Sequence, residues 1–212
     1  MKKIDFKKEY KELYRPSAKK ESIVNVPKMN YLMVDGQGDP NNSIEFENAL
    51  ESLYGLSYTL KFMFKNKEKP EGYFEYVVPP LEGLWWAKEG AAKDLLMLQQ
   101  NKEDWRWTLM IMIPDFYTPE MIKEAKEILK NKKNPESLNK LYVQSLEEGL
   151  CVQIMYIGSY SDEMPTIEKM HKFAADNGYK LRDKHHEIYL NDPRKTVPEK
   201  LKTVLRHPVT KV

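Results

Sequence analysis

Three stretches of the chain carry apolar residues at the three- and four-residue spacing of an amphipathic helix. The first covers 43–66 and begins with a serine, a residue type that caps helix N-termini. The second covers 119–133 after Thr118, and the third covers 164–179 and ends at Asn177-Gly178, a common helix stop. The pattern therefore predicts three main helices.

Shorter runs bounded by Gly, Pro or Asn are rich in β-branched and aromatic residues and predict strands. These runs cover 29–36, 73–80, 105–116, 150–158, 186–190 and 200–209. Residues 93–100 predict a short helix and 135–149 a further helical segment, whereas the polar residues 1–20 are expected at the periphery.

The order of these elements repeats in the two halves of the chain. Each half contains a strand, a turn, a helix and a strand with a glutamate when Gly36 is aligned with Gly158 and Glu75 with Glu187. A further strand follows in each half, which indicates a tandem β-α-β-β duplication. Neither half has enough strands to close its own core, so we expect both to pack as one α+β domain with a cleft between them.

Composition narrows the function classes. The net charge is only +2, from 34 basic and 32 acidic residues that are interspersed along the chain, so no basic surface for nucleic acid or an anionic membrane is indicated. No run approaches the roughly 18 apolar residues of a membrane-spanning helix, and the N-terminus has no signal-peptide pattern. The one cysteine, Cys151, is expected as a buried thiol. These features predict a cytoplasmic protein.

The C-terminal third carries a family resemblance. A strand ending in IGSY (157–160), a helix ending in NGY (177–179) and the segment HEIYLNDPRKTVPEKLKT (186–203) resemble the GyrI-like small-molecule-binding superfamily. This superfamily includes DNA gyrase inhibitor proteins and the effector domains of multidrug-sensing transcription regulators. PPLEGLWW (79–86) and WRWTLMIMIP (105–114) resemble a stand-alone branch of it.

The resemblance implies a polar arm over 1–22 and one domain over 23–212, with a first unit of about 23–148 and a second of about 149–212. It also implies pseudo-twofold symmetry, an antiparallel sheet and an aromatic-lined groove between the units. A buried glutamate at the centre of the groove contacts the ligand in this family, and Glu187 stands at that position. Some stand-alone members are similar to hydrolases that open the cyclopropane ring of DNA-alkylating natural products. No helix-turn-helix is evident.

The residues alone leave two readings of Glu187. Alternation along the strand places Ile188 and Leu190 against the helices, and Glu187 and Tyr189 on the opposite side. That side is either a solvated sheet face or the ligand cleft. The resemblance favours the cleft, where a carboxylate among aromatic rings would meet a cation, a ligand donor or a water molecule.

Aromatic residues are abundant, with 13 Tyr, 7 Phe and 4 Trp, and they line either the core or a site for a flat ligand. Adjacent Trp85 and Trp86 point to opposite faces, so one is expected in the core and the other is a candidate for ligand stacking. Trp107 suits core packing better than a site. Phe116 and Tyr117 are candidates for a pocket lid.

Two further residues are candidates for the site. Tyr156 is either a donor in the cleft or a tyrosine at the surface. Glu75, aligned with Glu187 in the repeat, is a second candidate ligand contact.

Metal chemistry is not indicated by spacing. His185 and His186 are adjacent and point in opposite directions, while His171 and His207 lie elsewhere in the chain. No Cys/His spacing matches a zinc site, and no Ser/His/Asp arrangement indicates a nucleophile. We therefore expect chemistry without a metal or cofactor.

Three hypotheses follow. The first is a hydrolase of a planar, hydrophobic electrophile with a fused cyclopropane ring, in which Glu187 is the general base and Tyr156 or a neighbouring donor stabilises the developing phenolate. The second is a binding module for cationic aromatic drugs, in which Glu187 pairs with the cation. The third is a protein partner of gyrase.

Overall fold

The structure is a computed structural model that describes residues 3–87 and 104–212. The strands are β1 (Ser22–Val26), β2 (Met29–Gln37), β3 (Leu81–Ala87), β4 (Trp105–Ile113), β5 (Tyr142–Leu146), β6 (Gly149–Ile157), β7 (Tyr179–Leu181), β8 (His185–Tyr189) and β9 (Lys202–Lys211). The helices are α1 (Phe6–Glu9), α2 (Lys11–Tyr14), α3 (Ile44–Phe62), α5 (Pro119–Lys132) and α6 (Met164–Asp176), with 3-10 turns η2 (Glu136–Lys140), η3 (Tyr160–Asp162) and η4 (Pro198–Lys200).

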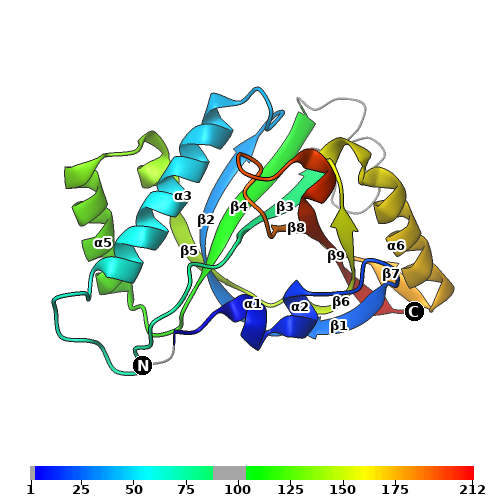
Figure 1. Ribbon diagram of the computed structural model, residues 1–212, viewed down its shortest axis with the longest axis horizontal. Coiled ribbons are helices and arrows are strands. Elements are labelled where there is room, and N and C mark those ends of the chain that lie inside the picture. The colour runs from blue at the N-terminus through cyan, green and yellow to red at the C-terminus, as the bar shows by residue number, and fades with distance from the viewer. Residues whose placement is uncertain (1–2, 88–103) are drawn as a thin grey trace.

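The strands form one antiparallel sheet in the order β1-β6-β9-β8-β3-β4-β2-β5, with β7 paired to β9. The order is the same from either edge when each strand is replaced by its repeat equivalent, which places a pseudo-twofold axis between β8 and β3. The edge strands are exchanged, because β1 pairs with β6 and β5 pairs with β2. The predicted α+β duplication is confirmed (Figure 1).

The register corrects the alignment of the two repeats. Gly83 lies opposite Glu187 at the pseudo-twofold axis, so Gly83 and not Glu75 is the repeat equivalent of Glu187. Counting outward through the paired strands matches Gly158 with Gly38 rather than with Gly36. Glu75 is exposed and lies outside the sheet.

The predicted strand 73–80 is wrong. The segment makes one bridge, between Ile4 and Tyr76, and the sheet strand begins at Leu81, directly after Pro79 and Pro80. Prolines lack the N–H that a central strand needs, so the sheet takes the residues after them. The aromatic residues before them pack instead against the rings around Phe116.

The predicted helix ends are confirmed by their caps. Ser43 Oγ accepts from the backbone N–H of Phe46 at 3.2 Å, and Thr118 caps α5 in the same way. The α6 helix ends at Asn177, followed by Gly178 with φ +77°. Helices α3 and α6 lie on one face of the sheet, over its two halves, and α5 packs beside α3 (Figure 1).

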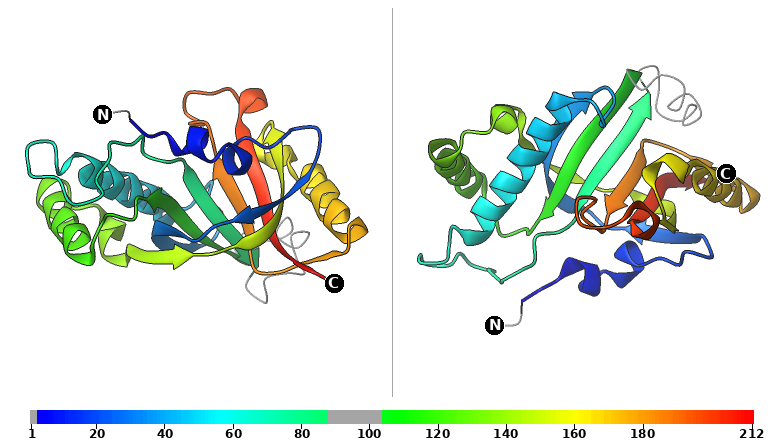
Figure 2. Two further views of the ribbon diagram at one scale, coloured as in Figure 1. Left: turned by 90° about the horizontal axis from the view of Figure 1, so that it is seen from below. Right: turned by 45° about the horizontal axis from the view of Figure 1, so that its top comes forward.

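Other expectations for the chain need correction. The segment 135–149 forms only the short turn η2 and then β5, because its second part completes the sheet edge beside β2. The strand β1 was not predicted. Residues 1–20 are not simply peripheral, since α1 and α2 cover the face of the sheet opposite α3 and α6 and bury Leu13 and Tyr14 (Figure 2). The predicted helix 93–100 lies outside the described residues.

A buried ionic network lies under this N-terminal arm. The guanidinium of Arg206 donates to the Leu13 carbonyl at 2.8 Å and lies 3.4 Å from a carboxylate oxygen of Glu148. His186 lies between two carboxylates, with Nδ1 3.0 Å from Glu148 and Nε2 3.0 Å from Glu82. The network therefore joins β3, β8 and β9 to the arm.

None of the helices in the described part of the chain combines the length and the apolar character of a membrane-spanning segment.

The network makes stability depend on pH. Burial alone would lower the pKa of His186, but the charge of Glu148 and hydrogen bonds to Glu148 and Glu82 outweigh it and raise the pKa from 6.5 to about 9. A pKa raised on folding gives stability that is complete below about pH 6.5 and is lost as the pH rises through about 9.

We predict that the stabilisation of wild type over His186→Gln shrinks by roughly 3 kcal/mol between pH 6.5 and 9.5, because folding raises the pKa of His186 from 6.5 to about 9. Urea unfolding at several pH values measures it. An unchanged difference between wild type and variant across this range would mean that His186 is not charged in the folded protein.

Candidate functional site

Strand β8 presents its side chains to two different environments. His185, Glu187 and Tyr189 lie on the face that carries α3 and α6, whereas His186 and Ile188 face the N-terminal arm. The predicted orientation of this strand, with Ile188 against the helices and Glu187 on the opposite side, is therefore wrong. Both faces of the sheet are covered, and Ile188 is fully buried on the face under the N-terminal arm. An apolar residue on this strand therefore does not indicate which face carries the helices.

A chain of hydrogen bonds holds Glu187. Nε1 of Trp85 donates to the Tyr189 hydroxyl at 3.0 Å, and that hydroxyl donates to Glu187 Oε2 at 2.7 Å. The chain needs Gly83, because a Cβ there would lie 2.8 Å from Nε1 of Trp85 and 3.3 Å from the Tyr189 hydroxyl. The missing side chain at the pseudo-twofold axis thus makes room for the groups that orient the carboxylate.

A second carboxyl group meets Glu187 from the start of α6. Glu163 is the N-cap residue of α6. Burial raises the pKa of Glu163 well above its usual value, and the charge of Glu187 and a hydrogen bond to it raise it further. These effects favour the neutral form of Glu163 more strongly than in an ordinary glutamate. Two carboxyl groups side by side, one of them with a raised pKa, form an arrangement typical of acid–base chemistry.

Aromatic rings surround this carboxyl pair. The ring of Trp85 stacks on Phe46 of α3 at a centroid distance of 6.3 Å, and Tyr160 packs edge-on against Tyr189 at 5.6 Å. Burial, followed by the charges of Glu187 and Glu163, raises the pKa of Tyr160 to about 12. Tyr160 is nevertheless 37% exposed, so its phenol is both close to the pair and open to solvent.

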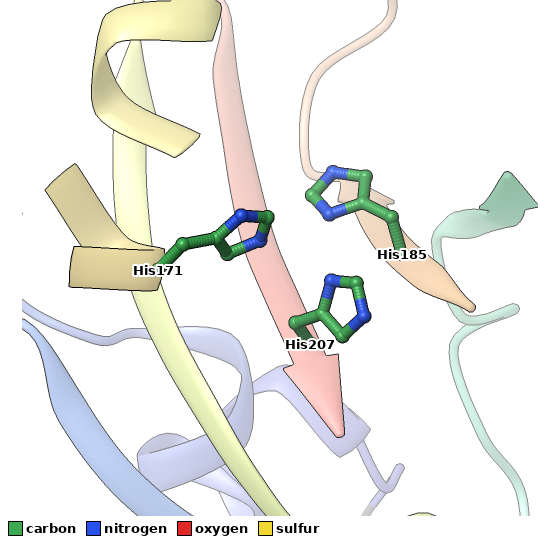
Figure 3. Close-up of side chains that lie close together, drawn as sticks. All are labelled: His171, His185 and His207. Atoms are coloured by element: carbon green, nitrogen blue, oxygen red, sulfur yellow. The ribbon is translucent and has the colours of Figure 1, made fainter. Parts of the chain in front are cut away.

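Three histidines form a cluster (Figure 3), and one of them, His185, lies next to Glu187, with Nε2 3.4 Å from Oε1. His171, His185 and His207 each offer a ring nitrogen, and these atoms all lie within 4.8 Å of one another. Burial, and then the neighbouring His185, lower the pKa of His171 to about 4, and burial lowers that of His207 well below its usual value. These two rings are therefore neutral at pH 7, which is the form that binds metal ions.

The structure brings only part of the predicted site together. Trp85 is linked to Glu187 through the Tyr189 hydroxyl. Trp107 is fully buried in the core, where its ring packs against Phe46. Trp86 lies on the opposite face of the sheet, where Lys184 Nζ is 3.3 Å from its ring centroid.

The other predicted residues lie elsewhere. Phe116 and Tyr117 belong to an aromatic cluster with Tyr76, and the Tyr117 hydroxyl is 3.1 Å from that of Tyr76. The Tyr156 hydroxyl donates to the Ser159 carbonyl at 2.9 Å, which engages it locally.

A groove of about 680 Å³ lies on the face opposite Glu187. Its walls include Asp35, Trp86 and Lys184. Asp35 already accepts from Thr108 at 2.6 Å and from Tyr142 at 3.0 Å, and Lys184 lies over Trp86. The unusual chemistry gathers instead at Glu187, where a carboxyl with a raised pKa and unpaired buried imidazoles meet. We therefore place the candidate site at Glu187.

Comparison with known proteins agrees with this fold. The model of the GyrI-like small molecule binding domain matches residues 109–210. The chain is 44% identical to an uncharacterized conserved protein from Listeria innocua, with 98% of this chain and all of that one covered and a TM-score of 0.88. The chain belongs to the GyrI-like family.

Two other structures extend this comparison. A hydrolase encoded by lin2189 from Listeria innocua is 43% identical over 99% of this chain and all of its own, with a TM-score of 0.88. The EcmrR C-terminal domain shares the fold alone, at 14% identity and a TM-score of 0.55 over 91% of this chain and 98% of its own. No curated protein sequence matches the chain.

Sequence reasoning missed Glu163, Tyr160 as a member of the cluster and the grouping of three histidines. Glu163 stands just before Met164-Pro165, at the start of a predicted helix, and nothing in the local pattern points it at a strand 24 positions later. The histidines come from a helix and two strands, so only the sheet order brings them together.

We predict that Gly83→Ala lowers the free energy of unfolding by roughly 1–3 kcal/mol, because its methyl group would overlap the Trp85 indole. On a Trp85→Phe background, which lacks the indole nitrogen, the same change should cost clearly less. A double-mutant cycle in urea measures this coupling. Equal costs on both backgrounds would contradict the role of Gly83.

Proposed function

We propose that this GyrI-like protein is a hydrolase that opens the cyclopropane ring of hydrophobic, planar, DNA-alkylating compounds, with Glu187 as general base. The observation that carries the proposal is the Glu187 carboxylate, which accepts a hydrogen bond from Tyr189 and lies beside Glu163, a carboxyl group with a raised pKa, between aromatic rings. The full-length similarity to a hydrolase from Listeria innocua supports hydrolysis as the reaction type. The cyclopropane substrate rests on the family resemblance.

In the proposed reaction, Glu187 removes a proton from water as the water oxygen attacks the unsubstituted carbon of the cyclopropane ring. The strained carbon–carbon bond breaks, and its electron pair passes through the conjugated ring to the carbonyl oxygen, which becomes a phenolate. The phenolate then takes up a proton, so the net reaction adds one water molecule. Ring strain and aromatisation drive it, so the protein mainly positions the water and stabilises the developing charge.

The proposal assigns these tasks to groups around Glu187. The Trp85 ring, stacked on Phe46, supports a flat substrate. Tyr160 is the proposed donor to the developing phenolate, because its ring packs on Tyr189 while its edge is exposed. The raised pKa of Glu163 favours its neutral form, which keeps a second negative charge away from Glu187.

Glu187→Gln should lower the turnover of a cyclopropane-bearing alkylating compound by about 10²–10⁴-fold, because the general base is lost. The loss of the dienone absorbance follows the reaction. Glu168→Gln is the matched control, since Glu168 is exposed on α6, and it should react like wild type. Affinity for the neutral ring-opened product should stay within a few-fold of wild type.

Binding of cationic aromatic compounds is the second candidate function, favoured by the small-molecule-binding family and by a carboxylate among aromatic rings. In that case the wild type would show no turnover, and Glu187→Gln would lose affinity for the cation. Quenching of tryptophan fluorescence by a flat cationic dye measures this. Gyrase inhibition would instead change DNA supercoiling with no small molecule present.

Glu163→Gln should retain most of the turnover, because the amide keeps a neutral hydrogen-bond donor beside Glu187. The wild-type rate should change as the pH rises through the raised pKa of Glu163, and this step should be absent from the pH profile of the variant. A variant profile that still contains the step would assign it to another group.

A further inference from the structure

The three clustered histidines come from three separate elements. His171 lies on α6, His185 at the start of β8 and His207 on β9. Figure 3 shows their rings directed toward one another from three sides. Ring centroids are 5.0 Å apart for His171 and His207, 5.8 Å for His185 and His207, and 6.5 Å for His171 and His185.

Most ring nitrogens of these imidazoles are enclosed and make no hydrogen bond, although Nε2 of His185 lies 3.4 Å from Glu187 Oε1. His185 and His207 are each 1% exposed. Both ring nitrogens of each, and Nε2 of His171, have no hydrogen-bond partner among the described residues. Burying an unpaired polar nitrogen costs free energy, and native proteins pair nearly all of them. One nitrogen of each ring lies within 4.8 Å of the other two, so the lack of hydrogen bonds indicates that something else occupies their shared space.

We propose that His171, His185 and His207 bind one divalent transition-metal ion, of which Zn²⁺ is the best match. Imidazole nitrogen is a preferred ligand of this metal class. Zinc–nitrogen distances of about 2.0–2.1 Å in a tetrahedral site put ligand nitrogens about 3.3 Å apart. The three ring nitrogens now lie within 4.8 Å of one another, and small side-chain rotations would bring them to that spacing, most easily at the half-buried His171.

The fourth side of the site faces the proposed catalytic carboxylate. Nε2 of His185 lies 3.4 Å from Glu187 Oε1. Three histidines with one open position are the ligand set of catalytic rather than closed structural zinc sites. A water molecule at the open position would lie within reach of Glu187, so the metal site and the carboxylate would share one solvent molecule.

The proposed metal site depends on the three histidines and does not require the cyclopropane reaction. The ion would also fix α6 to β8 and β9, because each element contributes one ligand. Loss of any one histidine would leave two ligands and a much weaker site.

Metal binding by the whole purified chain tests the proposal. After removal of bound metal with a chelator, wild type should bind one Zn²⁺ per chain in equilibrium dialysis. His171→Asn should weaken binding by more than about 100-fold, because even indirect partners of a metal site change affinity by about 10–100-fold. Cys151→Ala is the control and should bind like wild type, since this thiol lies on the opposite face of the sheet.

Co²⁺ gives a readout that does not depend on any variant folding. Wild type loaded with Co²⁺ should show the intense visible absorption of a four-coordinate site with nitrogen ligands, and Zn²⁺ should displace it. Weak absorption typical of six-coordinate surface binding, the absence of a saturable site, or His171→Asn binding equal to wild type would each overturn the proposal.

Discussion

The pairing of β3 with β8 across the pseudo-twofold axis is the constraint on which the site depends. It sets Gly83 opposite Glu187, and the missing side chain at position 83 lets the Trp85 indole and the Tyr189 phenol meet beside it. That meeting orients the carboxylate through one hydrogen bond of 2.7 Å. The two repeats therefore have equivalent strands but different side chains at the axis. The second repeat contributes the Glu187 carboxylate, and the first contributes Gly83, which leaves room for the groups that orient it.

The two faces of the sheet differ in whether their buried ionisable side chains have partners. Under the N-terminal arm, His186 and Arg206 are paired with carboxylates, so these buried charges are compensated. Under α6, His185, which is adjacent to His186 on the same strand, has no hydrogen-bond partner among the described residues, and burial and the charge of Glu187 raise the pKa of Glu163. Compensated charges stabilise a fold, whereas uncompensated groups in one place are typical of a functional site.

The sequence predicted the fold better than the site. Helical spacing and the cap residues Ser43 and Thr118 located the helices, because these signals are local. The strand 73–80 was misplaced because alternating aromatics there fill a cluster around Phe116, and β5 was missed because an edge strand follows a helical turn. Glu187 stood out through the family resemblance. Its partner Glu163 and the histidine cluster depend on sheet order, which periodicity does not encode.

A crystal structure of Glu187→Gln in complex with a cyclopropane-bearing alkylating compound would locate the site directly. We expect an intact ligand stacked on Trp85, with its cyclopropane carbon facing residue 187 and its carbonyl facing Tyr160. A ligand in the groove beside Trp86 and Lys184, on the opposite face of the sheet, would contradict this expectation.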